Sequence, residues 1–326
     1  MLRSTAMKIR IQLPAAVWPE SREAAPVQAG LALPALAWLL GRASLTAATC
    51  QDKIERAPLL LADLMPQSEP GYWLCADPVS LRLDNNSVTL LDAHHFAISL
   101  TESDALIAAL NTQFASDGLR FVAASPTLWF VRLPEKPASQ FAPLAQVCGR
   151  NIAAHLPQGS EASRWHQILN EMQMLLYTHP VNDARAARGE ALVNGVWLSE
   201  GGIFPPERRP IRDLPVFADD AVAQAQGRLA GVAVQSLPAS AAMKDDAHLL
   251  LDTLVHYARM GDAYHWRETW LAMEKNWFTP LLQRYRAGEI ATLEFVFPDL
   301  KLIATLPRGR AWQCWRRARL PWSLAR

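Results

Sequence analysis

Hydrophobic and polar residues alternate near both ends of the chain, a pattern that is typical of half-buried β-strands. Near the start, Lys8 to Leu13 (KIRIQL) places its three aliphatic side chains on one face. Near the end, Ile290 to Phe297 and Leu302 to Leu306 alternate in the same way and are separated by a short turn. We therefore expect a strand from the first segment and a hairpin from the last two.

Apolar residues recur at helical spacing in several other segments. Glu161 to Tyr177 carries the strongest pattern, and His179-Pro180 ends it. Further helices are predicted at Pro34 to Leu40, Ala218 to Gln226, Ala247 to Met260 and His265 to Arg286.

A compact block with a different rhythm follows the turn-forming segment Pro66 to Gly71. It contains a predicted helix with Thr101 as N-cap and Asp104 three residues on. Short strands are predicted around it at Tyr72 to Leu83, Val88 to Leu91, Leu119 to Ala123 and Leu128 to Leu133. This order suits an inserted α+β domain, which we place at residues 67–150, between a first part of the core at 1–66 and the remainder at 151–326.

Composition narrows the class of protein. Half of the 326 residues are hydrophobic and 19% are charged, so the chain can bury a sizeable core. Lysine and arginine number 32 against 31 acidic residues, which excludes a global electrostatic attraction to nucleic acid or an acidic membrane. The apolar run Gly30 to Gly41 is too short to span a membrane. The four cysteines show no zinc-ligand spacing and suit a reducing compartment, so we expect a cytoplasmic protein; they are Cys50, Cys75, Cys148 and Cys314. We also expect no targeting segment, and we expect translation to start at Met1 or Met7.

A dense polar grouping lies between the strongest helix and the next predicted strand. Its members, which we take as candidate ligand-binding residues, are His179, Asn182, Arg185, Asn194 and Trp197. An arginine fork with histidine and amide donors suits an anion such as phosphate. In the alternative interpretation, His179 and Asn182 cap the adjoining helices and Arg185 pairs with Glu190.

Two other motifs suggest a ligand-binding site. Glu200-Gly201-Gly202, in a predicted loop at Ser199 to Pro206 after the strand Val193 to Leu198, would bring backbone N–H groups close to a phosphate. No helix opens behind it, so a plain turn is the simpler interpretation. His94-His95 near Asp92 invites a metal, but adjacent residues on a strand point to opposite faces. We predict no metal site, no cofactor and no catalytic residue from these patterns.

The C-terminal tail, Arg308 to Arg326, mixes arginine with tryptophan, as single-strand nucleic-acid grooves do. The candidate contact residues, for nucleic acid or for a protein partner, are Trp312, Trp315, Arg316 and Arg317. Alternatively, the tail docks its indole rings on the core and leaves the arginine heads in water.

The segment LLYTHPVNDARAARGEALVNGVWLSEGG, which ends at Gly202, resembles the archaeal-type cofactor-independent phosphoglycerate mutases. That family carries His-Pro-Val-Asn, then Arg, Gly, Asn, Ile-Trp and Gly-x-Gly in the same order. The segment WLCADPVSLRLDNNSVTLLDAHHFAISLTESDALIAALNTQF, which starts at Trp73, resembles the family's inserted domain. The resemblance implies an α/β fold: a reduced alkaline-phosphatase-like core with an inserted small α+β domain.

Over nearly its whole length the chain is similar to the RpfE-type regulatory proteins of bacteria, which are phosphoglycerate mutase-like. The segments PALAWLLGRA and HWRETWLAMEKNWFTPLL and the ending Trp315-Arg316-Arg317 carry this second resemblance. It implies a regulatory role and a protein partner.

The departures from the mutase pattern concern its chemistry. In the alkaline-phosphatase superfamily, Asp and His hold two metal ions and a Ser or Thr accepts the phosphoryl group. Where the mutases carry the first metal Asp in a Pro-Asp-Gly turn, this chain reads Leu13-Pro14-Ala15-Ala16, and no counterpart of the late Asp-His-Ser/Thr-Pro element follows Gly231. The family's phosphate-binding positions fall at Leu74 and at Pro126 to Leu128. Because phosphoryl transfer depends on neutralised charge, the resemblance implies a kept scaffold and a lost chemistry.

Three functions are compatible with these observations. The first is a catalytically inactive phosphoglycerate mutase-like protein with a binding or regulatory role, with a possible residual anion pocket at Arg185. The second is a mutase or phosphatase whose site is rearranged, for which the acidic and histidine residues to inspect are Asp63, Asp92, His94, Asp219 and Asp220. The third is a nucleic-acid accessory protein that uses the Trp/Arg tail, which the charge balance disfavours.

Overall fold

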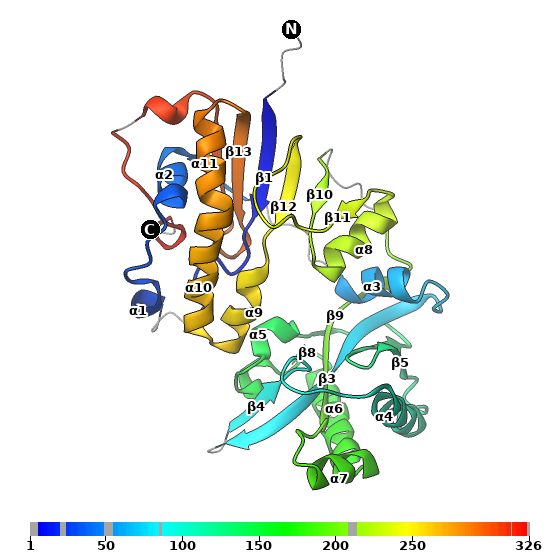
Figure 1. The fold of residues 1–326 in the computed structure, drawn as a ribbon. Coiled ribbons are helices and arrows are strands. Elements are labelled where there is room, and N and C mark those ends of the chain that lie inside the picture. The colour runs from blue at the N-terminus through cyan, green and yellow to red at the C-terminus, as the bar shows by residue number, and fades with distance from the viewer. Residues whose placement is uncertain are drawn as a thin grey trace. The chain divides into compact units, whose positions relative to one another are not determined.

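The computed structural model describes residues 6–19, 24–48, 55–84, 87–207, 214–313 and 315–324. The chain forms two compact units (Figure 1): one combines Met1–Asp52 with Arg209–Arg326, and the other is Lys53–Arg208. The second unit is an insertion, since the chain leaves the first unit and later returns to it. It extends beyond the predicted range 67–150 on both sides, because later elements pair with its sheet and pack on it.

The described part of the first unit is built on a seven-stranded sheet. In spatial order its strands are β11 (Val234–Gln235), β10 (Val216–Phe217), β12 (Ala247–Leu250), β1 (Met7–Gln12), β13 (Ile290–Phe297), β14 (Leu302–Pro307) and β2 (Ser44–Ala47). The pairs from β11 to β13 are parallel, whereas β13–β14 and β14–β2 are antiparallel. The α/β class, the first strand and the terminal hairpin are confirmed.

Most helices of the first unit contribute buried apolar side chains to the core that packs on this sheet. Their bounds are α1 (Ala24–Gln28), α2 (Pro34–Arg42), α8 (Ala221–Ala230), α9 (Thr253–Met260), α10 (Ala263–Met273) and α11 (Thr279–Arg286). A π-helical turn, Glu274–Phe278, joins α10 to α11. Its Glu274 carboxylate accepts hydrogen bonds from the backbone N–H groups of Ala35 and Leu36 in the first turn of α2. An anion at that end satisfies N–H groups that have no partner within the helix.

The predicted single helix at Ala247 to Met260 is wrong in its first part. Residues 247–250 form the central strand β12, and α9 begins only at Thr253. Ala247 and Leu249 are fully buried, and β12 pairs with β1 on one side and β10 on the other. Tertiary pairing therefore outweighs the helical spacing of these apolar residues.

The second unit contains a five-stranded antiparallel sheet within its described residues. Its strands are β4 (Ser87–Leu91), β3 (Gly71–Asp84), β6 (Leu128–Leu133) and β5 (Arg120–Ser125) in spatial order, with β9 (Gly195–Phe204) also paired to β3; a separate small pair is β7 (Ser139–Gln140) and β8 (Gln158–Gly159). The helices are α3 (Arg56–Leu64), α4 (Leu100–Gln113), α5 (Leu144–Val147), α6 (Ala162–Tyr177) and α7 (Pro180–Ala187). Helices α4 and α6 share one apolar core with the sheet.

Two local predictions in this unit need correction. The cap of α4 is Ser99 rather than Thr101: its hydroxyl accepts from the Glu102 N–H at 3.2 Å, and the Glu102 carboxylate accepts from the Ser99 N–H at 2.9 Å. This reciprocal pair satisfies two N–H groups at once, which the Thr101–Asp104 arrangement would not. The predicted loop from Ser199 onward is the second half of β9, because its backbone continues to pair with β3 as far as Phe204.

Among the described residues, no helix is both long enough and apolar enough to cross a membrane. Cys75 and Cys148 are buried and take part in no disulfide, whereas Cys50 and Cys314 lie outside the described residues.

Candidate functional site

The carboxyl ends of parallel strands are where ligands bind in α/β sheets, and in the first unit β1 ends in the turn Leu13 to Ala16. Leu13 and Ala16 are fully buried. Ala15 adopts a positive φ of 53°, and its carbonyl accepts a hydrogen bond from the Trp266 indole at 3.1 Å. Burial raises the pKa of Asp299, while the backbone N–H groups of Ala15 and Ala16 act on it in the opposite direction. The turn thus presents apolar side chains, and its polar backbone groups face protein atoms.

Three further aspartates follow β10 and β12, two of the strands on one side of β1. Asp220 caps α8 through a 2.8 Å bond from the Ala223 N–H, and Asp219 accepts from the Leu237 N–H at 3.1 Å. Asp252 precedes α9. Its pKa is raised mainly by burial and, to a smaller extent, by the negative charge of Asp220. Asp219 and Asp220 therefore serve N–H groups of a loop and a helix end, whereas the Asp252 side chain makes no capping hydrogen bond to α9.

This edge does not fit a two-metal phosphoryl-transfer centre. Such a centre needs several carboxylate and imidazole ligands whose donor atoms converge on each ion. Within the described residues, the one group of three His, Cys, Asp or Glu side chains that converges closely enough lies in the second unit instead, at Asp92, His95 and Cys148.

A second polar cluster lies between α3 and the β3–β9 pair, with Asp77 buried and Arg56 and Glu200 partly exposed. The Asp77 carboxylate accepts a hydrogen bond from Arg56 at 3.3 Å, and Arg56 lies 3.6 Å from Glu200. Burial raises the pKa of Asp77 to about 6 against the opposing effect of Arg56. Burial, then the charge of Asp77, raises the pKa of the neighbouring Cys75 thiol well above its usual value. A thiol held protonated in this way is a poor nucleophile.

The Gly201-Gly202 pair serves this close strand packing. A Cβ atom on Gly201 would collide with Leu74 and with the backbone of Trp73, and one on Gly202 would collide with Glu55. The register of β3 and β9 shifts between Trp73 and Cys75. The glycines therefore permit close approach of two strands and a helix, and neither a phosphate cradle nor an open turn forms there.

The structure places the five candidate ligand-binding residues around one turn and its neighbouring strands. His179 caps α7 through a 3.2 Å bond from the Val181 N–H to its Nδ1 atom. The buried amide of Asn182 donates to the carbonyls of Leu176 and Val193 and accepts from the Val193 N–H, all within 3.0 Å.

Arg185 is 1% exposed, and all three guanidinium nitrogens bond to protein oxygens. It donates to the Ala191 carbonyl at 2.7 Å, to the Ala97 carbonyl at 2.8 Å and to the Glu102 carboxylate at 3.1 Å. The carboxylate of Glu190, the partner expected from the sequence, lies 3.5 Å from the Arg185 guanidinium. This geometry directs the arginine fork at the turn before α4 and not at solvent.

Asn194 and Trp197 lie on or next to β9 and tie it to neighbouring segments. The Asn194 amide exchanges two hydrogen bonds with the backbone of Leu81, at 2.7 and 3.0 Å. The Trp197 indole donates to the Ala142 carbonyl at 2.9 Å. All five residues therefore make contacts that hold the turn and the sheet in place.

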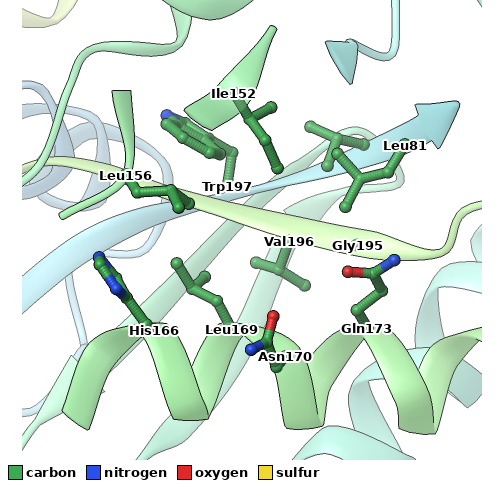
Figure 2. Close-up of a pocket in the computed structure, with 11 residues that line it drawn as sticks. Leu81, Ile152, Leu156, His166, Leu169, Asn170, Gln173, Gly195, Val196 and Trp197 are labelled. Carbon is green, nitrogen blue, oxygen red and sulfur yellow. The ribbon is translucent and has the colours of Figure 1, made fainter. Parts of the chain in front are cut away.

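A small cavity of about 170 Å³ lies between α6 and the strands β3 and β9 (Figure 2). Leu169, Val196 and Trp197 give it apolar walls, and Asn170 and Gln173 bring amide groups from α6. Among the described residues no lysine or arginine lines it, and His166 is the one ionisable side chain of the lining. The cavity therefore lacks the cation that a phosphate ligand would require.

The C-terminal segment lies against α2 in the first unit. The Arg319 N–H donates to the Ala37 carbonyl at 3.0 Å, and a Cβ on Gly41 would collide with the backbone of Arg317. Trp322 contacts Trp266 and Trp270, with ring centroids 6.5 and 6.3 Å apart.

Trp312 and Trp315 behave differently, since they are 67% and 63% exposed and pack on one another at a centroid distance of 4.9 Å. Arg316 and Arg317 are exposed beside them, although Arg316 reaches the Ala43 carbonyl at 3.5 Å. The tail thus docks one indole and exposes two.

The sequence alone did not predict the Arg56–Asp77–Glu200 cluster, and it did not predict that Cys148 lies beside Asp92 and His95. The His94-His95 motif can be recognised in the sequence. Cys148 is distant from it in the sequence, and only the fold brings Cys148 close to His95. The other residues considered for a rearranged site do not join such a group within the described chain.

Comparisons with known proteins identify distant relatives. The chain is 28% identical over 176 residues to 2,3-bisphosphoglycerate-independent phosphoglycerate mutase 2 of Methanothermobacter thermautotrophicus, covering 51% of this chain and 42% of that protein. It is 24% identical over 157 residues to the corresponding mutase of Methanosarcina mazei, covering 46% and 38%. The matched stretch is thus less than half of either relative's length. These similarities indicate distant homology to the archaeal-type cofactor-independent phosphoglycerate mutases.

A solved structure, the cofactor-independent phosphoglycerate mutase of Thermoplasma acidophilum, aligns over 98% of this chain and 95% of its own, with 14% identity and a TM-score of 0.44. No protein-family model matches the chain.

Proposed function

We propose that this chain is a cytoplasmic, catalytically inactive relative of the phosphoglycerate mutases with a binding or regulatory role, as its resemblance to the RpfE-type proteins implies. The observation that carries the proposal is the turn Leu13 to Ala16 at the end of β1. It stands where the mutases carry a metal-binding Asp, yet its side chains are apolar and its backbone faces Asp299 and Trp266. A phosphoryl group cannot be transferred efficiently without neutralised charge at that position.

The mutase-like candidate residues support the same proposal. Asn182, Arg185 and Asn194 are held by backbone carbonyls and N–H groups, so their retention is explained by architecture without a ligand. We assign them to the fixing of the α6–α7–β9 turn.

The exposed pair Trp312 and Trp315, with Arg316 and Arg317 beside it, supports a contact surface for a partner. Exposed indoles beside arginine are enriched at protein interfaces. A protein partner accords better with the near-zero net charge than nucleic acid does.

The experiment is an enolase-coupled mutase assay of the full chain with 3-phosphoglycerate and Mn²⁺, with the Methanothermobacter thermautotrophicus enzyme as positive control. We expect the rate to stay at background. Turnover proportional to protein concentration and abolished by a chelator would overturn the proposal in favour of a rearranged mutase or phosphatase site. In that event, loss of the turnover in Asp252→Asn, but not in the exposed Asp104→Asn, would locate the site at the carboxyl edge of the sheet.

A further inference from the structure

Three side chains with metal-binding atoms meet in the second unit. Asp92 follows β4, His95 lies in the turn before α4, and Cys148 follows α5. One ligand atom from each lies within 4.8 Å of the others. The group therefore combines an oxygen, a nitrogen and a sulfur donor.

The backbone fixes the two segments that supply these donors. The Gly149 N–H donates to the Leu90 carbonyl at 2.8 Å, and the Leu90 N–H donates to the Arg150 carbonyl at 3.2 Å. These bonds hold the residue after α5 beside the end of β4, two positions before Asp92. The approach of Cys148 to Asp92 is thus set by strand-like pairing and not by the side chains alone.

The turn after β4 selects one of the two adjacent histidines. The Asp92 Oδ1 atom accepts from the His94 N–H at 3.1 Å and lies 2.9 Å from His95 Nδ1. His94 is exposed, whereas His95 is turned toward the carboxylate. The objection that neighbouring histidines point in opposite directions therefore does not apply, since the group uses only one of them.

Burial makes this group unusual. Asp92 is 5% exposed and Cys148 is 2% exposed, beside the apolar side chains of Leu90, Val147 and Trp197. A carboxylate in such surroundings is costly unless a cation or several donors neutralise it. The His95 side chain keeps 18% of its surface exposed and offers a route for an ion. The same burial of Cys148 argues against a Cys–His nucleophile, which a substrate must reach.

We propose that Asp92, His95 and Cys148 bind one divalent transition-metal ion, with Zn²⁺ as the best match. Thiolate, imidazole and carboxylate are together the ligands of zinc, whereas Mg²⁺ and Ca²⁺ prefer oxygen alone. Three protein ligands leave a fourth position for water. The ion links the turn before α4 to the end of α5, so its role is to stabilise this part of the second unit. The site departs from the sequence-based expectation of no metal and does not depend on the proposed function.

The test is a titration of the metal-free full chain with Co²⁺, which occupies zinc sites and reports on its ligands by absorption. We expect one equivalent to bind with a near-ultraviolet thiolate-to-cobalt band, and Zn²⁺ to displace it. Cys148→Ser removes this band. Since loss of even an outer hydrogen bond at a metal site lowers affinity about 10- to 100-fold, His95→Gln weakens Co²⁺ binding by about tenfold or more.

Matched controls keep the result interpretable. Cys75→Ser and His94→Gln change the same residue types within the second unit and leave the band intact. Absence of the band in the wild type, or its persistence in Cys148→Ser, overturns the proposal. If Cys148→Ser does not fold, as judged by far-ultraviolet circular dichroism, then unchanged Co²⁺ affinity in the partly exposed His95→Gln overturns it. Mutase activity plays no part in this readout, so the site and the proposed function fail independently.

Discussion

Asp77 is a buried carboxylate that lies 3.3 Å from the Nη1 atom of Arg56, and the Glu200 carboxylate lies 3.6 Å from the same nitrogen. Two acids thus share one arginine in an environment with little water. Burial dominates, and the pKa of Asp77 rises to about 6. The folded protein therefore binds a proton at pH values where the unfolded chain has released it, because an ordinary aspartate titrates near pH 3.9.

The direction of the resulting pH dependence is fixed by this rise. The contribution of Asp77 to stability is full below about pH 4 and is lost as the pH rises toward about 6, since the folded pKa lies above the unfolded one. At roughly 1.4 kcal/mol per pKa unit, the loss is at most about 3 kcal/mol. We predict that the free energy of unfolding falls less over this range in Asp77→Asn than in the wild type. Denaturant unfolding at several pH values measures it, with Asp104→Asn as the exposed control; parallel profiles for Asp77→Asn and the wild type would contradict the account.

Sequence reasoning reached some of these residues and not others for a physical reason. His179 accepts from the N–H group two positions ahead, so a local pattern predicts its capping role, whereas Asn182 binds backbone groups of Leu176 and Val193, six and eleven positions away. Asp77 and Glu200 meet only because β3 pairs with β9, and the shift in their register is invisible in either strand alone. Cys148 likewise lies close to Asp92 only because its backbone pairs with Leu90, far away in the sequence.

At the scale of elements, the C-terminal segment divides into a docked part and an exposed part. Trp322 packs on Trp266 and Trp270 of α10, whereas Trp312 and Trp315 lie on the surface and contact each other. Composition predicts an aromatic tail, but it does not tell which indole is buried. Helix α2 receives this segment and is itself capped from outside by Glu274, a contact with no sequence signature.

This division predicts different effects of three tryptophan substitutions. Removal of a buried aromatic side chain costs about 3–5 kcal/mol, so the half-buried Trp322→Ala should lower the free energy of unfolding by about 2–4 kcal/mol. The double variant Trp312→Ala with Trp315→Ala should stay within about 0.5 kcal/mol of the wild type, since surface substitutions rarely do more. Denaturant unfolding followed by circular dichroism compares them. A large loss in the double variant would make the pair a packing element and remove the support for a contact surface there.

At the scale of the whole molecule, the chain keeps a scaffold whose sequence relatives are phosphoglycerate mutases, although the match covers about half of it. The α/β class and terminal strands followed from local alternation and from family resemblance. The extent of the inserted unit did not, because β9 and α6 join a sheet that begins far earlier in the chain. The carboxyl edge of the first unit holds aspartates that serve N–H groups, beside an apolar turn at the end of β1.

Among the described residues, this edge lacks the converging ligands of a two-metal centre, and the proposed loss of activity rests on that lack. The most direct test is the metal content of the purified, untagged Cys148→Ser variant, in which the separate site at Asp92, His95 and Cys148 is disabled. The account predicts no Mn, Zn or Mg above the level of a blank. About two metal ions per chain, as phosphoryl-transfer centres of this kind hold, would contradict it.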